Sequence, residues 1–464
     1  MWRERQQRPP GPSYLTPFLV GREMRADPLG FVRRMFEEYG DLSVVRMGPI
    51  SAYLLFHPDD VKHCLQERHT NFVKGPIVGR VKVLIGEGLF TSEGDFWRRQ
   101  RRLAQPAFHR ERIAGFVDTM VRCTADRLDG WEPRAASGAP FDLAAEMSAL
   151  TLTIVGRALF GRDLSGEAAA AGAALATALE FCAERALTYL TPPLALPTAK
   201  NRAFRRARRV LDGLVYRMID ARRRSGEPRD DLLGMLMAAR DEETGDGMTA
   251  RQLRDEVMTF LLAGHETTAV ALTWTWYLLS QHRAVADRLR REVVAVLGAR
   301  TPTLADLPRM PLARMVVEEA MRLYPPVWGI GRQAVAADTI GGYRIPAGAV
   351  LSLSPWITHR HPAFWEEPDR FDPDRFTPER IRARHRFAYF PFSGGPRLCI
   401  GETFALVEAQ LIVAMMAQRY RLAVVPGTLV EPEPHLTLRP RGGLPVTVRP
   451  TTLETDAARV ACAS

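Results

Sequence analysis

The spacing of hydrophobic residues along the chain is that of amphipathic helices over much of its length. Apolar residues recur three and four positions apart through most of the stretch from Phe96 to about Arg300, which predicts a largely helical region. Its strongest helix begins at Thr249, where Thr-Ala-Arg-Gln fits a capping box, and extends to about Gln281. At about 1.5 Å per residue, this helix would be roughly 50 Å long. The pattern predicts a mainly helical protein.

Three further segments predict helices from their spacing and end signals. The segment "DPLGFVRRMFEEYG" predicts an early amphipathic helix that ends at a glycine. The segment "LARMVVEEAMRLY" predicts a helix that ends before Pro325 and Pro326. A last long helix follows Cys399, with apolar residues at helical spacing from Phe404 to Met415.

A few short segments predict a small β region. "LSVVRMGPISAYLLF" predicts a hairpin with its turn at Gly48 and Pro49, and "GGYRIPAGAVLSLSP" predicts strand and turn. "HLTLRPRGGLPVTVRP" predicts a closing hairpin, and the proline-rich stretch from His359 to Pro391 predicts irregular structure. The fold class is therefore mainly α with a small β-sheet region.

The chain shows no linker, charge block or internal repeat at which it could be divided. Its 46% hydrophobic and 25% charged residues are ordinary for a globular protein. We therefore expect residues 1–464 to form a single domain, with loose tails at residues 1–13 and 451–464.

The chain is strongly basic, with a net charge of +10, and only four of its 63 Lys+Arg residues are lysines. A basic surface suits nucleic acid, a membrane surface or an acidic protein partner. The sequence shows no nucleic-acid motif, which favours the acidic protein. The five scattered cysteines lack paired or zinc-type spacing, which indicates a reducing compartment, the cytoplasm.

Neither a signal peptide nor a transmembrane segment is expected. Arginines lead the N-terminus, but no apolar stretch follows them. Residues 258–280 come closest to a membrane span, yet His265 and Glu266 lie within them. Ionisable residues are costly inside a membrane, so this run is better explained as an internal helix.

The segment "FPFSGGPRLCIG" places Cys399 where irregular chain becomes helical. Unpaired N–H groups and the helix dipole at such a position favour a thiolate. Gly395 and Gly401 would allow a flat group to approach the backbone, and Arg397 could reach an anion at its edge. A cysteine thiolate is an axial ligand of haem iron in one class of haem proteins. The alternative is a buried cysteine at a helix start.

The motif Phe392-x-x-Gly395-x-Arg397-x-Cys399-x-Gly401 resembles the haem-binding signature of the haem-thiolate monooxygenases, the cytochrome P-450 superfamily. Four other stretches match the same family in the expected order, and the resemblance spans nearly the whole chain. It implies a helical triangular prism around a buried haem b, with Cys399 as the iron ligand. Lack of an N-terminal span is similar to the soluble bacterial members.

The stretch "AGHETT", from Ala263 to Thr268, resembles the oxygen-activation motif of the family. The resemblance implies that Ala263 lies against the haem, while Glu266 and Thr267 hold water and pass protons to iron-bound oxygen, which is general-acid work. The alternative is that Thr267 and Thr268 only bond back to the preceding helical turn.

Two further motifs concern charge. Glu319-x-x-Arg322 resembles the pair that the family locks with a downstream arginine, here Arg375, to steady the haem-side loops. In "WRRQRR", Trp97 and Arg101 lie one helical turn apart and resemble the pair that binds a haem propionate. By position, the residues implied as further propionate partners are Arg332 and Arg397.

The other arginines of "WRRQRR" are Arg98, Arg99 and Arg102, and in the family this helix borders the docking face for the electron donor. The alternative is a solvated basic helix face. No attached flavin reductase domain is expected, so electrons would come from a ferredoxin or flavodoxin with its reductase. An acidic donor would suit the arginines.

The activity implied by the resemblance is insertion of one O2-derived oxygen atom into an apolar substrate, a terpene, fatty acid or polyketide, by a monomer. The motifs look most like those of members that hydroxylate fatty acids, although terpene and polyketide oxidisers carry similar ones. The pocket residues implied by position are mostly apolar or small, and none of them would anchor a carboxylate; they are Phe90, Ala263, Val327, Gly329, Leu436 and Thr437. The alternative is other haem-thiolate chemistry, namely phenol coupling, isomerisation or peroxide-driven oxidation. A haem sensor is disfavoured, because no partner domain is visible.

Overall fold

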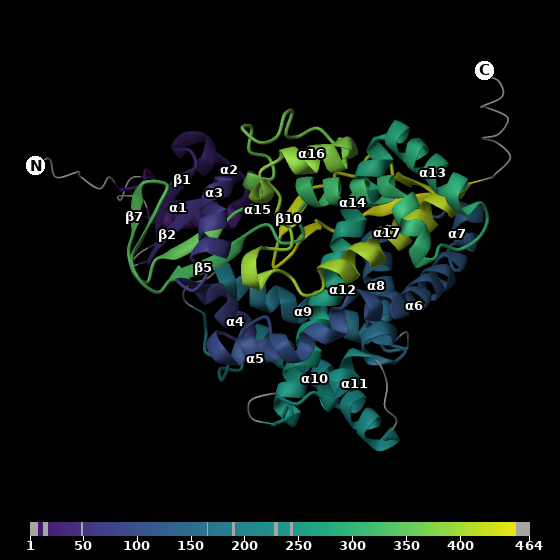
Figure 1. Cartoon of the computed structure of the whole chain (residues 1–464), viewed down its shortest axis with the longest axis horizontal. Coiled ribbons are helices and arrows are strands. Elements are labelled where there is room, and N and C mark those ends of the chain that lie inside the picture. The colour runs from purple at the N-terminus through teal and green to yellow at the C-terminus, as the bar shows by residue number, and fades with distance from the viewer. Residues whose placement is uncertain are drawn as a thin grey trace, which may run out of the picture.

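The computed structural model describes residues 8–12, 17–47, 50–164, 166–187, 191–226, 231–241 and 245–451. Helices dominate, as the hydrophobic spacing predicted, and they form the larger part of the molecule (Figure 1). The helices are α1 Pro17–Ala26, α2 Pro28–Tyr39, α3 Pro58–Lys62, α4 Pro76–Ile85, α5 Gly94–Ala104, α6 Arg110–Asp129, α7 Glu132–Ser137, α8 Leu143–Phe160, α9 Ala168–Leu187, α10 Ala199–Ser225, α11 Leu232–Ala238, α12 Ala250–Gln281, α13 Arg283–Leu297, α14 Pro311–Leu323, α15 Pro355–Thr358, α16 Pro378–Ala383 and α17 Glu402–Arg419.

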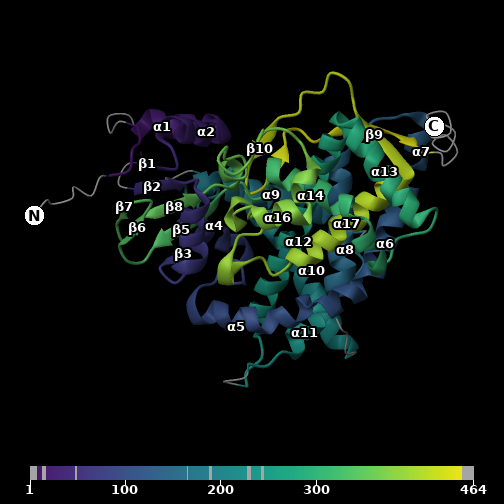
Figure 2. The same cartoon turned by 45° about the horizontal axis from the view of Figure 1, so that its top comes forward.

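The strands form small sheets, and the largest of them lies beside the N-terminal helices at one side of the molecule (Figures 1 and 2). The largest sheet has the strand order β1-β2-β8-β5-β3. Its β1 and β2 are the predicted early hairpin, whose turn residues Gly48 and Pro49 lie outside the described residues. The strands are β1 Leu42–Met47, β2 Ile50–Leu55, β3 Phe72–Lys74, β4 Phe141–Asp142, β5 Ile330–Ala334, β6 Asp338–Ile340, β7 Tyr343–Ile345, β8 Val350–Leu353, β9 Tyr420–Val424, β10 Pro432–Pro434, β11 Leu438–Pro440 and β12 Pro445–Pro450.

The prediction of a closing hairpin was wrong. Strand β11 pairs with β10, whereas β12 pairs with β4 and β9. The turn between them includes Gly442 and Gly443, both at positive φ, and it directs the two strands into different sheets. Turn residues alone cannot tell these pairings apart, because the partners that β11 and β12 take, namely β10, β4 and β9, all lie outside the segment that was interpreted as a hairpin.

Helix α12 is the long internal helix that the pattern predicted. Thr249 caps it, and the capping box with Gln252 is present in both directions. The helix packs against α8, α10, α14 and α17, so it runs through the middle of the helical part. Its side chains from Leu253 to Leu279 are mostly buried.

The Glu319–Arg322 pair of α14 is fully buried. Arg322 donates to Glu319 through Nε and Nη2 at 2.6 and 2.8 Å, and also to the backbone carbonyls of His359, Pro368 and Arg370. Arg375 lies 3.6 Å from the Glu319 carboxylate and donates to the Glu367 carbonyl. The pair thus ties the irregular segment after His359 to α14.

A second buried contact joins α12 to α8. The His265 ring lies 2.7 Å from the Ser148 hydroxyl, and Thr151 donates to the His265 carbonyl at 2.9 Å. Burial lowers the pKa of His265 to about 4. The imidazole is therefore neutral at pH 7 and serves to hold the two helices together.

Among the described residues, one helix is long and apolar enough to cross a membrane, and it is α8, Leu143–Phe160. Of its span, 67% is buried inside the protein, as in a core helix. The expectation that residues 258–280 come closest to a span was therefore wrong, because their Thr, Trp, Tyr and His side chains lower the mean hydropathy.

We predict that Arg322→Leu lowers the free energy of unfolding by about 3–5 kcal/mol, because it leaves the Glu319 carboxylate buried without its cation. Urea unfolding measures this. The matched control is Arg382→Leu, whose partner Glu379 has the same i,i+3 spacing on an exposed surface and should not matter measurably. Equal effects of the two changes would contradict the structural role.

The low pKa of His265 predicts a pH-dependent stability. Between about pH 6.5 and 4 the unfolded chain binds a proton that the folded protein does not, so stability falls as pH falls, by up to about 1.4 kcal/mol per unit. His265→Gln should flatten this slope in thermal unfolding across that range. The half-buried His69→Gln should leave it unchanged; identical slopes in all three proteins would refute the assignment.

Candidate active site

Cys399 is held by a tight loop just before α17. The Cys399 N–H donates to the Phe392 carbonyl at 3.0 Å, and the Leu398 N–H donates to the Gly395 carbonyl at 3.0 Å. Gly401 is the N-cap residue of α17. The cysteine thus has a fixed position beside a helix N-terminus, where it was predicted.

The structure gives a different reason for a glycine at each of two positions in this loop. Gly395 has a φ of 63°, and a Cβ there would clash with the carbonyl oxygen of Leu65. The approach of another chain segment is therefore enough to require this glycine. At Gly401 a Cβ would meet only Cys399 Sγ, at 3.9 Å, so this glycine keeps the space beside the sulfur open.

The protonation of Cys399 differs from the expectation. Burial raises the pKa of the thiol, while the backbone N–H groups of Gly401 and Glu402 and the charge of Arg101 lower it by less. The N–H groups at the helix terminus favour the thiolate, as predicted, but burial outweighs them. A bound metal cation deprotonates a coordinating thiol, so metal coordination would supply what the helix terminus lacks.

The interior surface of the protein fits a buried prosthetic group. Cys399 is exposed although its thiol is desolvated by surrounding protein. Ala263 is exposed in the middle of α12, whose neighbouring turns are buried. Exposure of this kind is what a buried prosthetic group would cover, and both residues are on the elements that the resemblance places on the two faces of a haem.

Cations gather near the predicted propionate end. Arg332 is buried, and its pKa is lowered to about 10 by burial and by Arg397. Burial and Arg397 also lower the pKa of Lys74 to about 7. Glu93 pairs with Arg397 and accepts from the Lys74 N–H at 2.7 Å. Buried cations are costly unless anions match them, so this set fits the two carboxylates of haem.

Trp97 and Arg101 extend from α5 toward the same region. The Arg397 guanidinium stacks on the Trp97 ring, 4.0 Å from its centroid, which is a cation–π contact. Arg101 donates to the Leu398 carbonyl at 2.9 Å, next to Cys399. The structure therefore brings Trp97 to the arginine cluster and Arg101 to the cysteine loop.

The two residues of the proton-relay motif make different contacts. The Thr267 hydroxyl donates to the Ala263 carbonyl at 2.7 Å, the backbonding alternative, while its lone pairs can still accept. Glu266 accepts from the Thr437 hydroxyl at 2.6 Å. Burial raises the pKa of Glu266, so the carboxyl holds a proton more readily than an exposed one.

The residues expected to line the pocket have varied exposure. Phe90 is exposed, Val327, Gly329 and Leu436 are half-buried, and Thr437 is buried. Thr437 was expected as a wall residue, yet it also holds the Glu266 carboxyl. No local pattern indicated that contact.

The α5 arginines are less available than expected. Arg98 pairs with Asp95, while Arg99 and Arg102 both pair with Asp241. Arg99 is mostly covered, but Arg98 and Arg102 remain exposed.

Sequence reasoning missed Lys74, Glu93 and Glu256. Lys74 donates to the carbonyls of Leu89 and Ser92 at 3.0 and 2.8 Å, and Glu256 accepts from the Leu89 N–H at 3.0 Å. Burial raises the pKa of Glu256 to about 7. One signal could have found Lys74, which is one of only four lysines in an arginine-rich chain.

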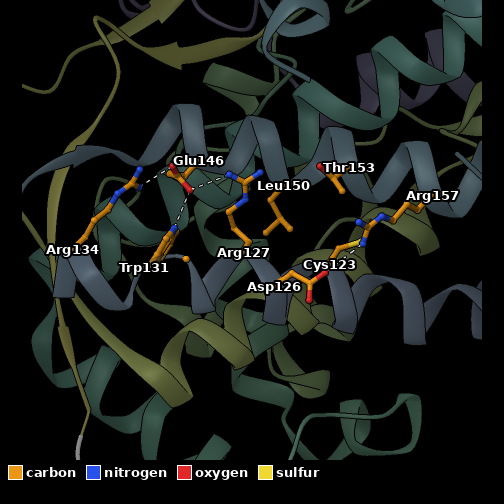
Figure 3. A pocket seen from close by; sticks show the side chains of 10 residues that line it. Cys123, Asp126, Arg127, Trp131, Arg134, Glu146, Leu150, Thr153 and Arg157 are labelled. Carbon is orange, nitrogen blue, oxygen red and sulfur yellow. Dashed lines mark hydrogen bonds and ion pairs between the residues drawn. The ribbon is translucent and has the colours of Figure 1, made fainter. Parts of the chain in front are cut away.

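A separate pocket lies between α6 and α8 (Figure 3). Glu146 at its wall accepts from Trp131 and Arg134 at 2.9 and 2.8 Å, and Arg157 pairs with Asp163. Its charges are thus matched within the protein, and no residue predicted for the site lines it. It is a surface hollow outside the candidate active site.

Comparison with known proteins agrees with the geometry. The family described as cytochrome P-450 matches residues 8–448. The chain is 40% identical to cyclooctatin synthase of Streptomyces melanosporofaciens, over 89% of this chain and 90% of that one. It is 34% identical to pentalenene oxygenase of Streptomyces avermitilis, over 88% and 90%. The crystal structure of the cytochrome P-450DA haem domain superposes with a TM-score of 0.87 at 29% identity, covering 96% of this chain and 97% of that one. With Cys399, the cation cluster and the Glu266–Thr267 motif in place, these matches show that the chain belongs to the cytochrome P-450 family and is a haem-thiolate monooxygenase.

Proposed function

We propose that this monooxygenase inserts one oxygen atom from O2 into an apolar terpene, with electrons from a separate ferredoxin or flavodoxin. The observation that carries the proposal is the exposed interior surface at Ala263 and Cys399. In this proposal the haem covers that surface, and the mostly apolar candidate residues line the substrate side.

Each candidate residue has a distinct task in this proposal. Cys399 is the iron ligand, and Trp97, Arg101, Arg332 and Arg397 hold the haem carboxylates. The haem supplies the activation of O2 when it is bound.

The substrate side belongs to α12 and its neighbours. Thr267 accepts and donates a proton through its hydroxyl, and Glu266 stores the proton that it passes on. Phe90, Val327 and Leu436 orient an apolar molecule and exclude water. Gly329 leaves room, since a Cβ there would meet only Ser352 Oγ, at 3.9 Å.

Relatives and pocket chemistry both favour a terpene over a fatty acid. Two of the relatives are named for terpene substrates. They are pentalenene oxygenase and cyclooctat-9-en-7-ol 5-monooxygenase, and the second is 38% identical over 86% of each chain. A fatty acid would need a cation for its carboxylate. The candidate pocket residues are Phe90, Ala263, Val327, Gly329, Leu436 and Thr437, and none of them is cationic.

A separate acidic donor fits the exposed arginines Arg98 and Arg102 on α5. This helix also carries Arg101, which contacts the cysteine loop. A donor bound here would lie close to the proximal side of the haem. We also propose that the protein acts in the cytoplasm, because scattered cysteines without a disulfide pattern are typical of a reducing compartment. We further propose that it acts as a monomer.

We predict that Cys399→Ser abolishes the thiolate-type spectrum of the haem protein, because serine offers no thiolate to the iron. Absorbance of the carbon monoxide complex measures this. Cys182→Ala removes a buried thiol elsewhere and should keep the spectrum. A thiolate-type spectrum in Cys399→Ser would exclude this residue as the ligand.

The proposed substrate class predicts a selective spectral response. Titration of the ferric protein with pentalenene should saturate the shift from low to high spin, because the ligand displaces water from the iron, while a fatty acid of similar size should not. Turnover should then require an added ferredoxin and reductase. A shift with the fatty acid alone, or product formed without the donor, would overturn the corresponding part of the proposal.

A further inference from the structure

We infer that the β10–β11 hairpin delivers protons to the active site. In this route His435, with Glu433 and Arg439, takes up protons from solvent, and Thr437 positions and relays them to the Glu266 carboxyl. The inference rests on the proposed role of Glu266 as the proton store.

The inner end of the route is the contact between Thr437 and Glu266. The hydroxyl of Thr437 donates to Glu266 Oε1 at 2.6 Å, although the two residues are 171 positions apart. Thr437 is only 5% exposed, so its hydroxyl is withdrawn from bulk water. A hydroxyl can donate one proton while it accepts another. A hydroxyl this close to a carboxyl is therefore suited to relay a proton to it.

The hairpin is anchored so that this contact is precise. Trp274 of α12 donates to the Leu438 carbonyl at 2.6 Å, and Trp328 donates to the His435 carbonyl at 2.9 Å. The Leu438 N–H donates to the Pro326 carbonyl at 3.0 Å. Both sides of Thr437 are therefore fixed to neighbouring elements, which keeps its hydroxyl against α12.

The outer end of the route is a charged cluster that reaches the surface. The exposed fractions rise from 5% at Thr437 to 24% at His435, 31% at Glu433 and 34% at Arg439. The cluster therefore spans the distance between the buried hydroxyl and solvent.

His435 has a partner in either protonation state. Its Nε2 lies 2.9 Å from Glu433 Oε2 and 3.1 Å from Arg439 Nη2. Glu433 can only accept and Arg439 can only donate, so a protonated Nε2 bonds to Glu433 and a bare Nε2 bonds to Arg439. A ring that has a partner with and without the Nε2 proton can take up a proton and pass it on.

His435 and Thr437 are close neighbours in the turn of the hairpin. The His435 N–H donates to the Thr437 carbonyl at 3.0 Å. The charges of His435 and Arg439 also act on Glu266, where both lower the pKa that burial raises. One water molecule between the imidazole and the hydroxyl would join the two ends of the route.

The other titratable groups near this part of α12 face elsewhere. His265 turns toward Ser148 of α8. Glu408 of α17 is fully buried and interacts with Thr268. Among the described groups packed around Glu266, the hairpin cluster is the one that combines partial exposure with action on its carboxyl.

The proton balance sets what the route must carry. Insertion of one oxygen atom consumes O2, two electrons and two protons, and it releases one water molecule with the oxidised substrate. The electrons come from the donor protein. Each proton passes from solvent to the His435 ring and then through Thr437, which gives its own proton to Glu266 and regains one from the ring side.

The first test uses the infrared C=O band of the Glu266 carboxyl in the ferric haem protein, assigned as the band that Glu266→Gln removes. Thr437→Val should move the band to higher frequency and raise its titration midpoint, because the hydrogen bond is lost. Thr437→Ser should restore both. An unchanged band in Thr437→Val would overturn the contact, whatever the substrate.

The second test separates proton supply from structure. His435→Gln keeps the backbone contacts but cannot carry a proton. It should lower coupling of NADH use to product about tenfold and release hydrogen peroxide instead, with an enlarged solvent isotope effect and an unchanged substrate-binding spectrum. His69→Gln, at a half-buried histidine outside the hairpin, is the control.

Equal coupling and isotope effects in His435→Gln and His69→Gln would overturn the route. If the wild type forms no product from any terpene, the substrate proposal fails. The proton route can still be tested by the infrared band and by the isotope effect on peroxide release without substrate.

Discussion

The buried ion pair between Glu319 and Arg322 organises the part of the molecule that carries the cysteine. Arg322 uses its remaining donors on three backbone carbonyls of the segment after His359, and Glu319 accepts from the Asp372 N–H at 2.9 Å. His359 in turn accepts from the Phe390 N–H at 2.9 Å. An irregular segment has few backbone partners of its own. The ion pair supplies them and so fixes the loop that ends at Cys399.

A second constraint is that the active site is built around an interior space. Ala263 and Cys399 present surface inside a core that is otherwise closely packed. Arg332, Arg397 and Lys74 bring positive charge to one end of that region, where Glu93 offers a matching carboxylate. Apolar voids and unmatched buried charge both destabilise a fold. Haem, with its apolar ring and two carboxylates, relieves both, which couples cofactor binding to the stability of the protein.

The substrate side is held in a different way from the cysteine side. Backbone hydrogen bonds and charged side chains hold the loop around Cys399, whereas a single hydroxyl, that of Thr437, is positioned at Glu266. Thr437 belongs to a hairpin that contacts α12 through Trp274 and the segment before β5 through Trp328. The same hairpin therefore carries Leu436, which we propose as a pocket residue, and holds the Glu266 carboxyl, which we propose as the acid of the proton relay. In this proposal, substrate contact and proton delivery meet in one short element.

Local signals in the sequence determined much of the fold and the identity of the site. The capping box at Thr249, the glycine after α2 and the spacing around Cys399 each act within a few residues, so they could be recognised without the fold. The tertiary structure decided the rest: which partners β12 takes, that Arg101 reaches Leu398, and that Thr437 bonds to Glu266. It also decided that burial outweighs the helix terminus in setting the pKa of Cys399. These outcomes depend on desolvation and on residues far apart in the sequence, and neither is written in any short stretch of the chain.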